Sequence, residues 1–170
     1  MAVHDATPVV ERIVSVLVEN RAGVLSHVVG LFSARGFNID SLAVGETEDP
    51  TMSRITLVTK VDEKTFEQLK KQLNKLIDVI KVQDLTAEGF IDRELMLVKV
   101  KNAPQSKTHI DALMKKFNLR IVDENPKILT IESTESLENT KKVLEKLKDV
   151  GIFEIAQTGA VALSKKPPKD

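Results

Sequence analysis

Residues 12–40 read RIVSVLVENRAGVLSHVVGLFSARGFNID, and this stretch decides the fold because its hydrophobic pattern changes within a few residues. The apolar run from Ile13 to Val18 predicts a strand. A short polar loop containing Gly23 follows. From Val24 to Arg35 the apolar residues recur at the helical spacing i, i+3, i+4 and i+7, and Gly36 then predicts a left-handed cap. One face of this predicted helix carries Leu25, Val28, Val29 and Phe32.

The loop before the helix has the features of a small anion site. The first amides of a helix lack intrahelical acceptors and lie at the positive end of its dipole. Gly23 has no Cβ, so a ligand can approach the backbone closely. Asn20 and Asn38 flank the helix, and we expect their side-chain amides to converge on the same ligand. The pattern is typical of a site for a small carboxylate such as that of an amino acid.

The rest of the N-terminal half continues as strands and one further helix. Strands are predicted at 37–46, 52–61 and 79–85, with a turn at 48–51 and a helix at 62–77. The order is therefore βαββαβ. The inward face of the second helix is predicted to carry Phe66, Leu69, Leu73, Leu76 and Ile77.

The C-terminal half repeats the N-terminal half. Arg12–Asn20 aligns with Arg93–Asn102, and Phe37-Asn38-Ile39 aligns with Phe117-Asn118-Leu119. The ends of the two later helices also match, and a second helical stripe contains Ile110, Leu113, Met114 and Phe117. We therefore predict an α+β protein of two ferredoxin-like βαββαβ units. The expected domains are residues 11–87 and 90–163, with flexible ends at 1–10 and 164–170.

Each predicted unit is a four-stranded antiparallel sheet with both helices on one face. Such a sheet has an unpaired outer edge, and the edge strand predicted at 37–46 is long and apolar. Pairing with a second copy removes this exposed edge. The sequence thus predicts a homodimer joined through edge strands.

Composition argues against several classes of function. The 25 basic and 25 acidic residues give a formal net charge of zero, and the sequence lacks cysteine, tyrosine and tryptophan. RNA-binding proteins of this architecture stack bases on aromatic residues of the central strands, whereas the strands at 12–18 and 52–61 contain none. No apolar run has the length of a membrane span, and no signal peptide is evident. We expect a cytoplasmic protein that binds neither nucleic acid nor membrane.

The sequence offers little for catalysis or metal binding. His4, His27 and His109 share no metal-ligand spacing, and none has a carboxylate placed in the sequence to orient it. No Gly-x-Ser-x-Gly elbow is present. We predict no catalytic residues and no metal site, which disfavours a free-standing enzyme.

Several segments together resemble the ACT domain of acetohydroxyacid synthase (acetolactate synthase) small subunits. They are ENRAGVLS at 19–26, VGLFSARGFNIDSL at 29–42 and DPTMSRIT at 49–56. REL at 93–95 and TGAVAL at 158–163 are similar to the C-terminal half of the same family. Two departures are visible, since the family often has Arg where His27 stands and Tyr where Phe37 stands.

The resemblance implies a regulatory role. A small subunit of this family binds a separate catalytic (large) subunit, raises its activity and confers feedback inhibition by valine. Thiamine diphosphate, FAD and Mg are expected in that catalytic subunit, and no cofactor is expected in this chain. The family's effector site at the ACT dimer interface maps here onto Asn20, Gly23, Val24, Leu25, Asn38 and Ile39.

Two questions stay open at the level of sequence. The alternative is an ACT-type sensor of another amino acid that regulates a different biosynthetic enzyme. In the second unit, Ala103-Pro104-Gln105 replaces Arg21-Ala22-Gly23, and Pro104 has no N–H to donate. We therefore expect an effector site only in the N-terminal unit, with the C-terminal unit serving dimer packing and communication with the catalytic subunit.

Overall fold

The computed structural model describes residues 8–167 and divides them into two compact units. One unit comprises the described residues up to Phe90 together with those from Ala162 onward, and the other is Ile91–Val161. The expected flexible ends fall partly on residues 1–7 and 168–170, which lie outside the described residues, as does His4. Val10 and Ser164, also expected in those ends, instead belong to strands.

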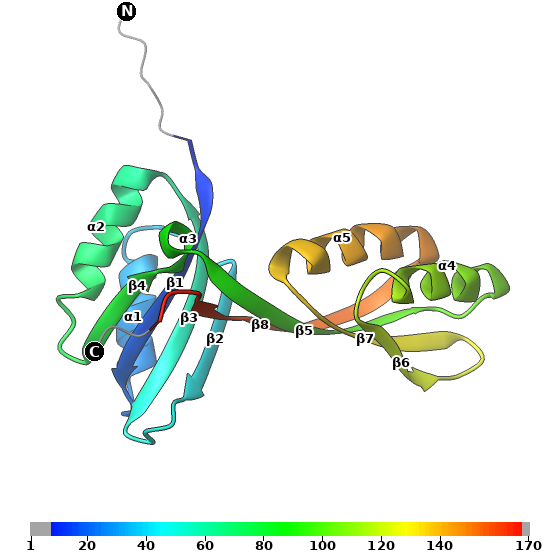
Figure 1. The fold of residues 1–170 in the computed structure, drawn as a ribbon, viewed down its shortest axis with the longest axis horizontal. Coiled ribbons are helices and arrows are strands. Elements are labelled where there is room, and N and C mark those ends of the chain that lie inside the picture. The colour runs from blue at the N-terminus through cyan, green and yellow to red at the C-terminus, as the bar shows by residue number, and fades with distance from the viewer. Residues whose placement is uncertain (1–7, 168–170) are drawn as a thin grey trace, which may run out of the picture. The chain divides into compact units, whose positions relative to one another are not determined.

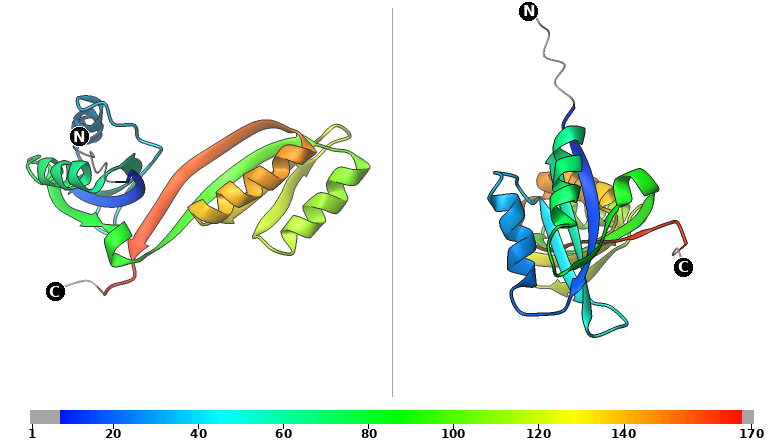
Figure 2. Two further views of the ribbon diagram at one scale, coloured as in Figure 1. Left: turned by 90° about the horizontal axis from the view of Figure 1, so that it is seen from above. Right: turned by 90° about the vertical axis from the view of Figure 1, so that its left-hand side faces the viewer.

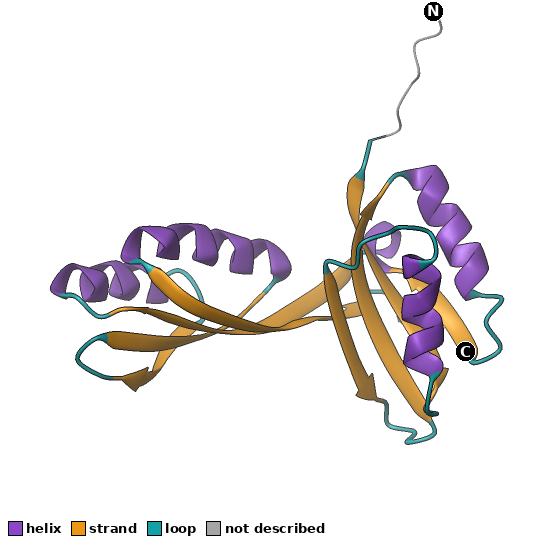
Figure 3. Ribbon diagram, turned by 180° about the vertical axis from the view of Figure 1, so that it is seen from behind, coloured by secondary structure: helices purple, strands orange, loops and turns teal. Residues whose placement is uncertain are grey.

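The first unit has the predicted βαββαβ order with one short helix added. Its antiparallel sheet has the strand order β2-β3-β1-β4. Helices α1 and α2 cover the same face of this sheet (Figures 1 and 3). The elements are β1 (Val10–Glu19), α1 (Val24–Ser33), β2 (Ser41–Glu46), β3 (Met52–Val61), α2 (Glu63–Leu73), β4 (Val79–Asp84) and α3 (Leu85–Glu88).

The core of the first unit follows from the two periodicities of its sequence. Val14, Val16 and Val18 of β1 are buried in the core on one face of the strand, and Ile13 and Ser15 on the other face are buried as well. Phe32 from α1 and Phe66 from α2 are fully buried in the same core. Helix α2 begins at a side-chain cap, since the Thr65 amide donates to the Asp62 carboxylate at 3.0 Å. The core side chains of the strands include Val14, Val16, Val18, Ile55 and Leu57.

The C-terminal end of α1 shortens the next strand. The amide of Gly36, with φ of 70°, donates to the Ser33 carbonyl, and the amide of Phe37 donates to the Phe32 carbonyl. This pair of bonds is a Schellman motif, which confirms the left-handed cap predicted at Gly36. Because Phe37 is used to close the helix, β2 begins at Ser41, and the prediction of a strand from residue 37 is wrong.

The predicted inward faces are wrong at two helix positions of the first unit and at Met114 of the second unit, which is 37% exposed. Leu25 is 40% exposed because Val24 points into the core in its place. Ile77 is 95% exposed because α2 ends at Leu73, so that the residues after it leave the helical period. Leu85, predicted at the end of a strand, instead begins the short helix α3 and is buried.

The second unit has the same topology, with the strand order β6-β7-β5-β8. Strand β8 runs beside β5, and α4 and α5 lie together on one face of the sheet (Figure 2). The prediction of two ferredoxin-like units is therefore confirmed. The elements are β5 (Phe90–Lys101), α4 (Pro104–Met114), β6 (Leu119–Glu124), β7 (Ile128–Glu135), α5 (Leu137–Leu147), the 3-10 turn η1 (Lys148–Val150) and β8 (Ile152–Ser164).

A carboxyl group is buried in the second unit. Glu94 is 5% exposed on the core-facing side of β5, and the Gln157 side-chain amide donates to it at 3.2 Å. Burial raises the pKa of Glu94 above its usual value, because the charged form loses its hydration. Ionisation of Glu94 therefore lowers the free energy of unfolding of this unit.

This burial predicts a pH-dependent stability difference between the wild type and Glu94→Gln. Because the pKa of Glu94 is higher in the folded chain, the protonated side chain contributes to the free energy of unfolding at pH below its unfolded-state pKa of about 4.3. This contribution is lost as the pH rises through the pKa of Glu94 in the folded chain. We expect the variant to gain free energy of unfolding relative to the wild type as pH rises from about 4 toward 7. Urea unfolding across this range measures the difference, and a difference independent of pH would contradict the expectation.

Candidate functional site

The loop between β1 and α1 leaves two backbone amides without an acceptor among the described residues. Gly23 is the residue before the helix and has φ of 89° and ψ of −18°, a left-handed conformation that favours glycine. No side chain caps this helix start. The Val24 amide is bonded to the Arg21 carbonyl at 3.4 Å, and within the described chain the amides of Leu25 and Ser26 have no acceptor. Two donors therefore point to solvent beside the positive end of α1.

Asn20 has a structural role in this loop. Its side-chain amide donates to the Glu46 carboxylate and to the Pro50 carbonyl, both at 3.0 Å, and its backbone amide donates to the Thr51 carbonyl. These contacts hold the β2–β3 turn against the end of β1. The side-chain carbonyl of Asn20 is left available to a ligand.

Asn102 occupies the equivalent position in the second unit. Its side-chain amide donates to the Asn125 carbonyl at 2.7 Å and contacts the Glu124 carboxylate at 3.5 Å. Its backbone amide donates to the Lys127 carbonyl. The asparagine that recurs in the sequence repeat is thus explained in both units by the same hairpin contact.

We expect Asn20→Ala and Asn102→Ala to destabilise the protein by similar amounts, about 1–2 kcal/mol each, because each removes two side-chain hydrogen bonds. Chemical denaturation of the two variants measures this. Asn102→Ala serves as the control for ligand binding at Asn20. A large loss for one variant and none for the other would show that the two asparagines are not equivalent.

Asn38 and Ile39 lie at the opposite end of the sheet from Gly23. The Asn38 carbonyl accepts from the Thr59 hydroxyl at 2.7 Å, and Thr59 pairs with Arg12. Arg12 precedes Asn20 by eight strand residues, which corresponds to roughly 26 Å. The expectation that the two asparagine side chains converge is therefore wrong within one chain.

The apolar residues of the predicted site differ in exposure. Val24 is 4% exposed and belongs to the core, so it contributes its backbone position. Ile39 is partly buried against the same core. Leu25 presents its side chain to solvent next to the free amides. Leu25 is therefore the apolar group that a ligand at this loop would meet first.

One histidine has a carboxylate partner that the sequence did not reveal. His27 Nδ1 lies 3.2 Å from the Asp78 carboxylate, and the Asp78 carbonyl accepts from the Glu19 amide at 2.9 Å. The expectation that no histidine has an orienting carboxylate is wrong here, because Asp78 comes from the distant turn before β4. The described residues contain no group of three or more His, Cys, Asp or Glu able to hold a metal ion.

The second unit arranges the corresponding helix start differently. Pro104 is the first residue of α4, and the amides of Ser106 and Lys107 both donate to the Ala103 carbonyl. Fewer amides are free than at α1. A cavity of about 300 Å³ lies here, lined by Lys101, Ala103, Gln105, Ser106, His109, Asp149 and Val150.

Within residues 8–167, the helices are too short or too polar to cross a bilayer. Two family models match the chain in sequence. Residues 14–81 match the acetolactate synthase (AHAS) small subunit-like ACT domain, and residues 93–166 match the small subunit of acetolactate synthase. Together the two matches span most of both units.

Individual relatives agree with these matches. The probable acetolactate synthase small subunit of Methanothermobacter thermautotrophicus is 46% identical over 155 residues, covering 91% of this chain and 92% of the relative. The acetolactate synthase small subunit of Bacillus subtilis is 42% identical and is covered to 91%. The crystal structure of the acetolactate synthase small subunit from Thermotoga maritima superposes with a TM-score of 0.80 at 38% identity, covering 94% of this chain and 99% of that one. With one family matched in both units, this chain belongs to the acetolactate synthase small subunits, and its first unit is their ACT domain.

Proposed function

We propose that this chain is the regulatory subunit of acetolactate synthase, which activates a catalytic subunit and confers inhibition by valine. The observation that carries this proposal is the pair of free amides at Leu25 and Ser26 beside the left-handed Gly23. In this proposal the thiamine diphosphate, FAD and Mg chemistry belongs to the catalytic subunit. This chain supplies an effector site and no catalytic residue.

The loop has the groups needed to recognise valine. The amides of Leu25 and Ser26 would donate to the effector carboxylate, each such bond contributing about 1.5–3 kcal/mol before entropic losses. The side-chain carbonyls of Asn20 and Asn38 would accept from the ammonium group, since their NH2 groups already donate elsewhere. Burial of the isopropyl group against Leu25 and Ile39 would add about 1.5–3 kcal/mol.

A single ligand that touches both ends of this sheet must lie between two copies. Strand β2 is an edge strand, and its first residue Ser41 is level with Ile13 whereas its last residue Glu46 is level with Val18. Antiparallel pairing of two β2 strands about a twofold axis places the Ser41 end of one copy beside the Glu46 end of the other. Asn38 and Ile39 of one copy then approach Asn20, Gly23, Val24 and Leu25 of its partner.

The same arrangement explains how valine would regulate. An effector shifts an equilibrium only if it binds one state better than another. A site made of groups from two copies changes shape when the copies move relative to each other. Valine would therefore select one arrangement of the ACT pair, and the catalytic subunit would respond to that arrangement.

The proposal is tested by reconstitution with the catalytic subunit of the same organism. We expect the rate of acetolactate formation to rise when the full chain is added and to fall again when valine is added. A catalytic subunit whose rate is unchanged by the chain would overturn the regulatory role. Calorimetric titration with valine, leucine, isoleucine and serine tests the effector, and binding of serine alone would favour a sensor for another enzyme.

A further inference from the structure

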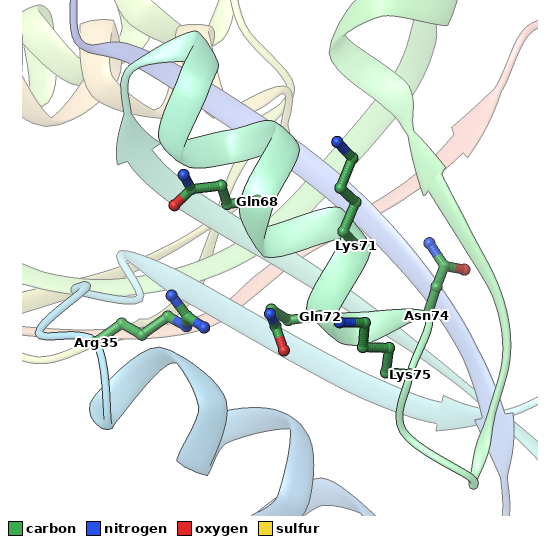
Figure 4. Close-up of a pocket in the computed structure, with 6 residues that line it drawn as sticks. All are labelled: Arg35, Gln68, Lys71, Gln72, Asn74 and Lys75. Carbon is green, nitrogen blue, oxygen red and sulfur yellow. The ribbon is translucent and has the colours of Figure 1, made fainter.

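A groove lies on the helical side of the first unit (Figure 4). It lies between α2 and the turn that follows α1, and its volume is about 560 Å³. The side chains are spread along the groove, with Arg35 facing α2 from across it (Figure 4). We call this groove the α2 surface. It is lined by Arg35, Gln68, Lys71, Gln72, Asn74 and Lys75.

The α2 surface carries positive charge without any acidic residue in its lining. In the described part of the chain, Arg35, Lys71 and Lys75 form no ion pair with an acidic group. Lys64, exposed one turn before Gln68, extends the same stripe. The whole sequence has equal numbers of acidic and basic residues, so this is a local separation of charge.

The acidic residues of α2 are committed to other contacts. Glu63 pairs with Arg12, whose guanidinium lies over the Phe66 ring, and Glu67 pairs with Lys70. The hydrogen bond from Lys70 lowers the pKa of Glu67, with a smaller effect from the charge of Lys71. Both carboxylates are therefore partly neutralised by basic residues of their own, and the outer face of the helix is left basic.

A large exposed apolar side chain follows this surface closely in the sequence. Ile77 is 95% exposed, two residues beyond Lys75. Its turn is fixed in place, since the Asp78 carbonyl accepts from the Glu19 amide and the Asp78 carboxylate contacts His27. Ile77 is the most exposed large apolar side chain of the described residues, so it is available to an apolar pocket on a binding partner.

We infer that the α2 surface, together with Ile77, docks an acidic segment of the catalytic subunit, with Ile77 entering an apolar pocket on that partner. This inference rests on the proposed regulatory function. The cations match carboxylates, and Gln68, Gln72 and Asn74 match the polar groups of a peptide backbone. Cations spread along a groove suit an extended segment better than a small anion, which needs donors that converge on one point (Figure 4).

The surface is also connected to the effector loop. The turn that carries Lys75 and Ile77 is bonded through Asp78 to the end of β1 and to His27, one helical turn beyond Gly23. A ligand at Gly23 and a partner at the α2 surface would therefore both lie next to the contacts that Asp78 makes with Glu19 and His27. A partner docked at this place would contact the turn that is hydrogen-bonded to the effector loop.

The test compares two double charge reversals in the full chain. Lys71→Glu/Lys75→Glu alters the α2 surface, and Lys60→Glu/Lys81→Glu is the control, because those two lysines are also exposed in the first unit but lie on strands β3 and β4. Affinity for the purified catalytic subunit is measured by calorimetry at low and moderate salt. We expect the α2 variant to bind at least tenfold more weakly with a smaller salt dependence, and the control to bind within twofold of the wild type.

A third variant, Ile77→Ser, changes an exposed side chain and leaves the core intact. We expect it to weaken the complex severalfold while its unfolding midpoint stays that of the wild type. Normal binding by both surface variants would overturn the docking inference while the wild-type complex upholds the regulatory role. A wild type that forms no complex would instead overturn the role itself. If inorganic phosphate raises the melting temperature of the wild type but not of the α2 variant, and both bind the catalytic subunit equally, the groove is a small-anion site and the inference fails.

Discussion

Replacing Gly23 with aspartate is expected to give a complex that keeps its activity and no longer responds to valine. A Cβ built on Gly23 meets no atom within 4 Å, so the fold has room for the side chain. The left-handed φ of 89° adds a strain of about 1–2 kcal/mol, and aspartate is among the residues that tolerate this conformation best. The new carboxylate would lie beside the amides of Leu25 and Ser26 and repel the carboxylate of valine. The rate of acetolactate formation as a function of valine concentration measures the effect.

Gly23→Ala is the matched control for this variant. Alanine imposes at least as much left-handed strain as aspartate but adds neither charge nor a long side chain. We expect Gly23→Ala to retain most of the valine response and to lose at least as much stability as Gly23→Asp. Ordinary valine inhibition of the Gly23→Asp complex would refute the site.

Leu69→Ala is expected to lower the free energy of unfolding by about 2–5 kcal/mol, the largest stability loss we predict. Leu69 lies on the buried face of α2, is 1% exposed and packs in the core cluster of the first unit. Its removal leaves a cavity because the surrounding strands relax only partly. Urea unfolding at equilibrium measures the loss.

Ile77→Ala is the matched control, since the helical pattern predicts both residues on one inward face. Because Ile77 is 95% exposed, its truncation is expected to change the free energy of unfolding by no more than about 0.5 kcal/mol. Equal losses for the two variants would contradict the placement of Ile77 outside the core.

Much of the fold can be predicted from the sequence because local pattern and tertiary structure agree. The repeat from Arg12 to Asn20 and from Arg93 to Asn102 indicates two copies of one unit, and the structure gives both the same strand order. The helix end at Gly36 and the loop at Gly23 depend on left-handed backbone conformations that only a few residue types adopt easily. Because these features depend on the local residue type, they can be predicted from one sequence.

The remaining features depend on contacts between distant segments. The pairing of Ser41 with Val58 and of Glu46 with Ser53 decides that Asn38 lies far from Asn20 in one chain, and no local pattern contains this register. The partner of His27 is Asp78, 51 residues away. The sequence does not distinguish the α2 surface from an ordinary solvated helix face, because both carry a row of basic residues. The difference lies in the ion pairs of Glu63 with Arg12 and of Glu67 with Lys70, and the first of these joins segments that are far apart in the sequence.

The central claim is that one valine site is built from two copies, and hybrid dimers test it most directly. A dimer of one Gly23→Asp chain and one Asn38→Ala chain, isolated with two affinity tags, has one site with both changes and one site with neither. We predict that each variant homodimer binds no valine in calorimetry and that the hybrid binds one valine per dimer with wild-type affinity. A hybrid that binds none would place the whole site within a single chain and contradict the account.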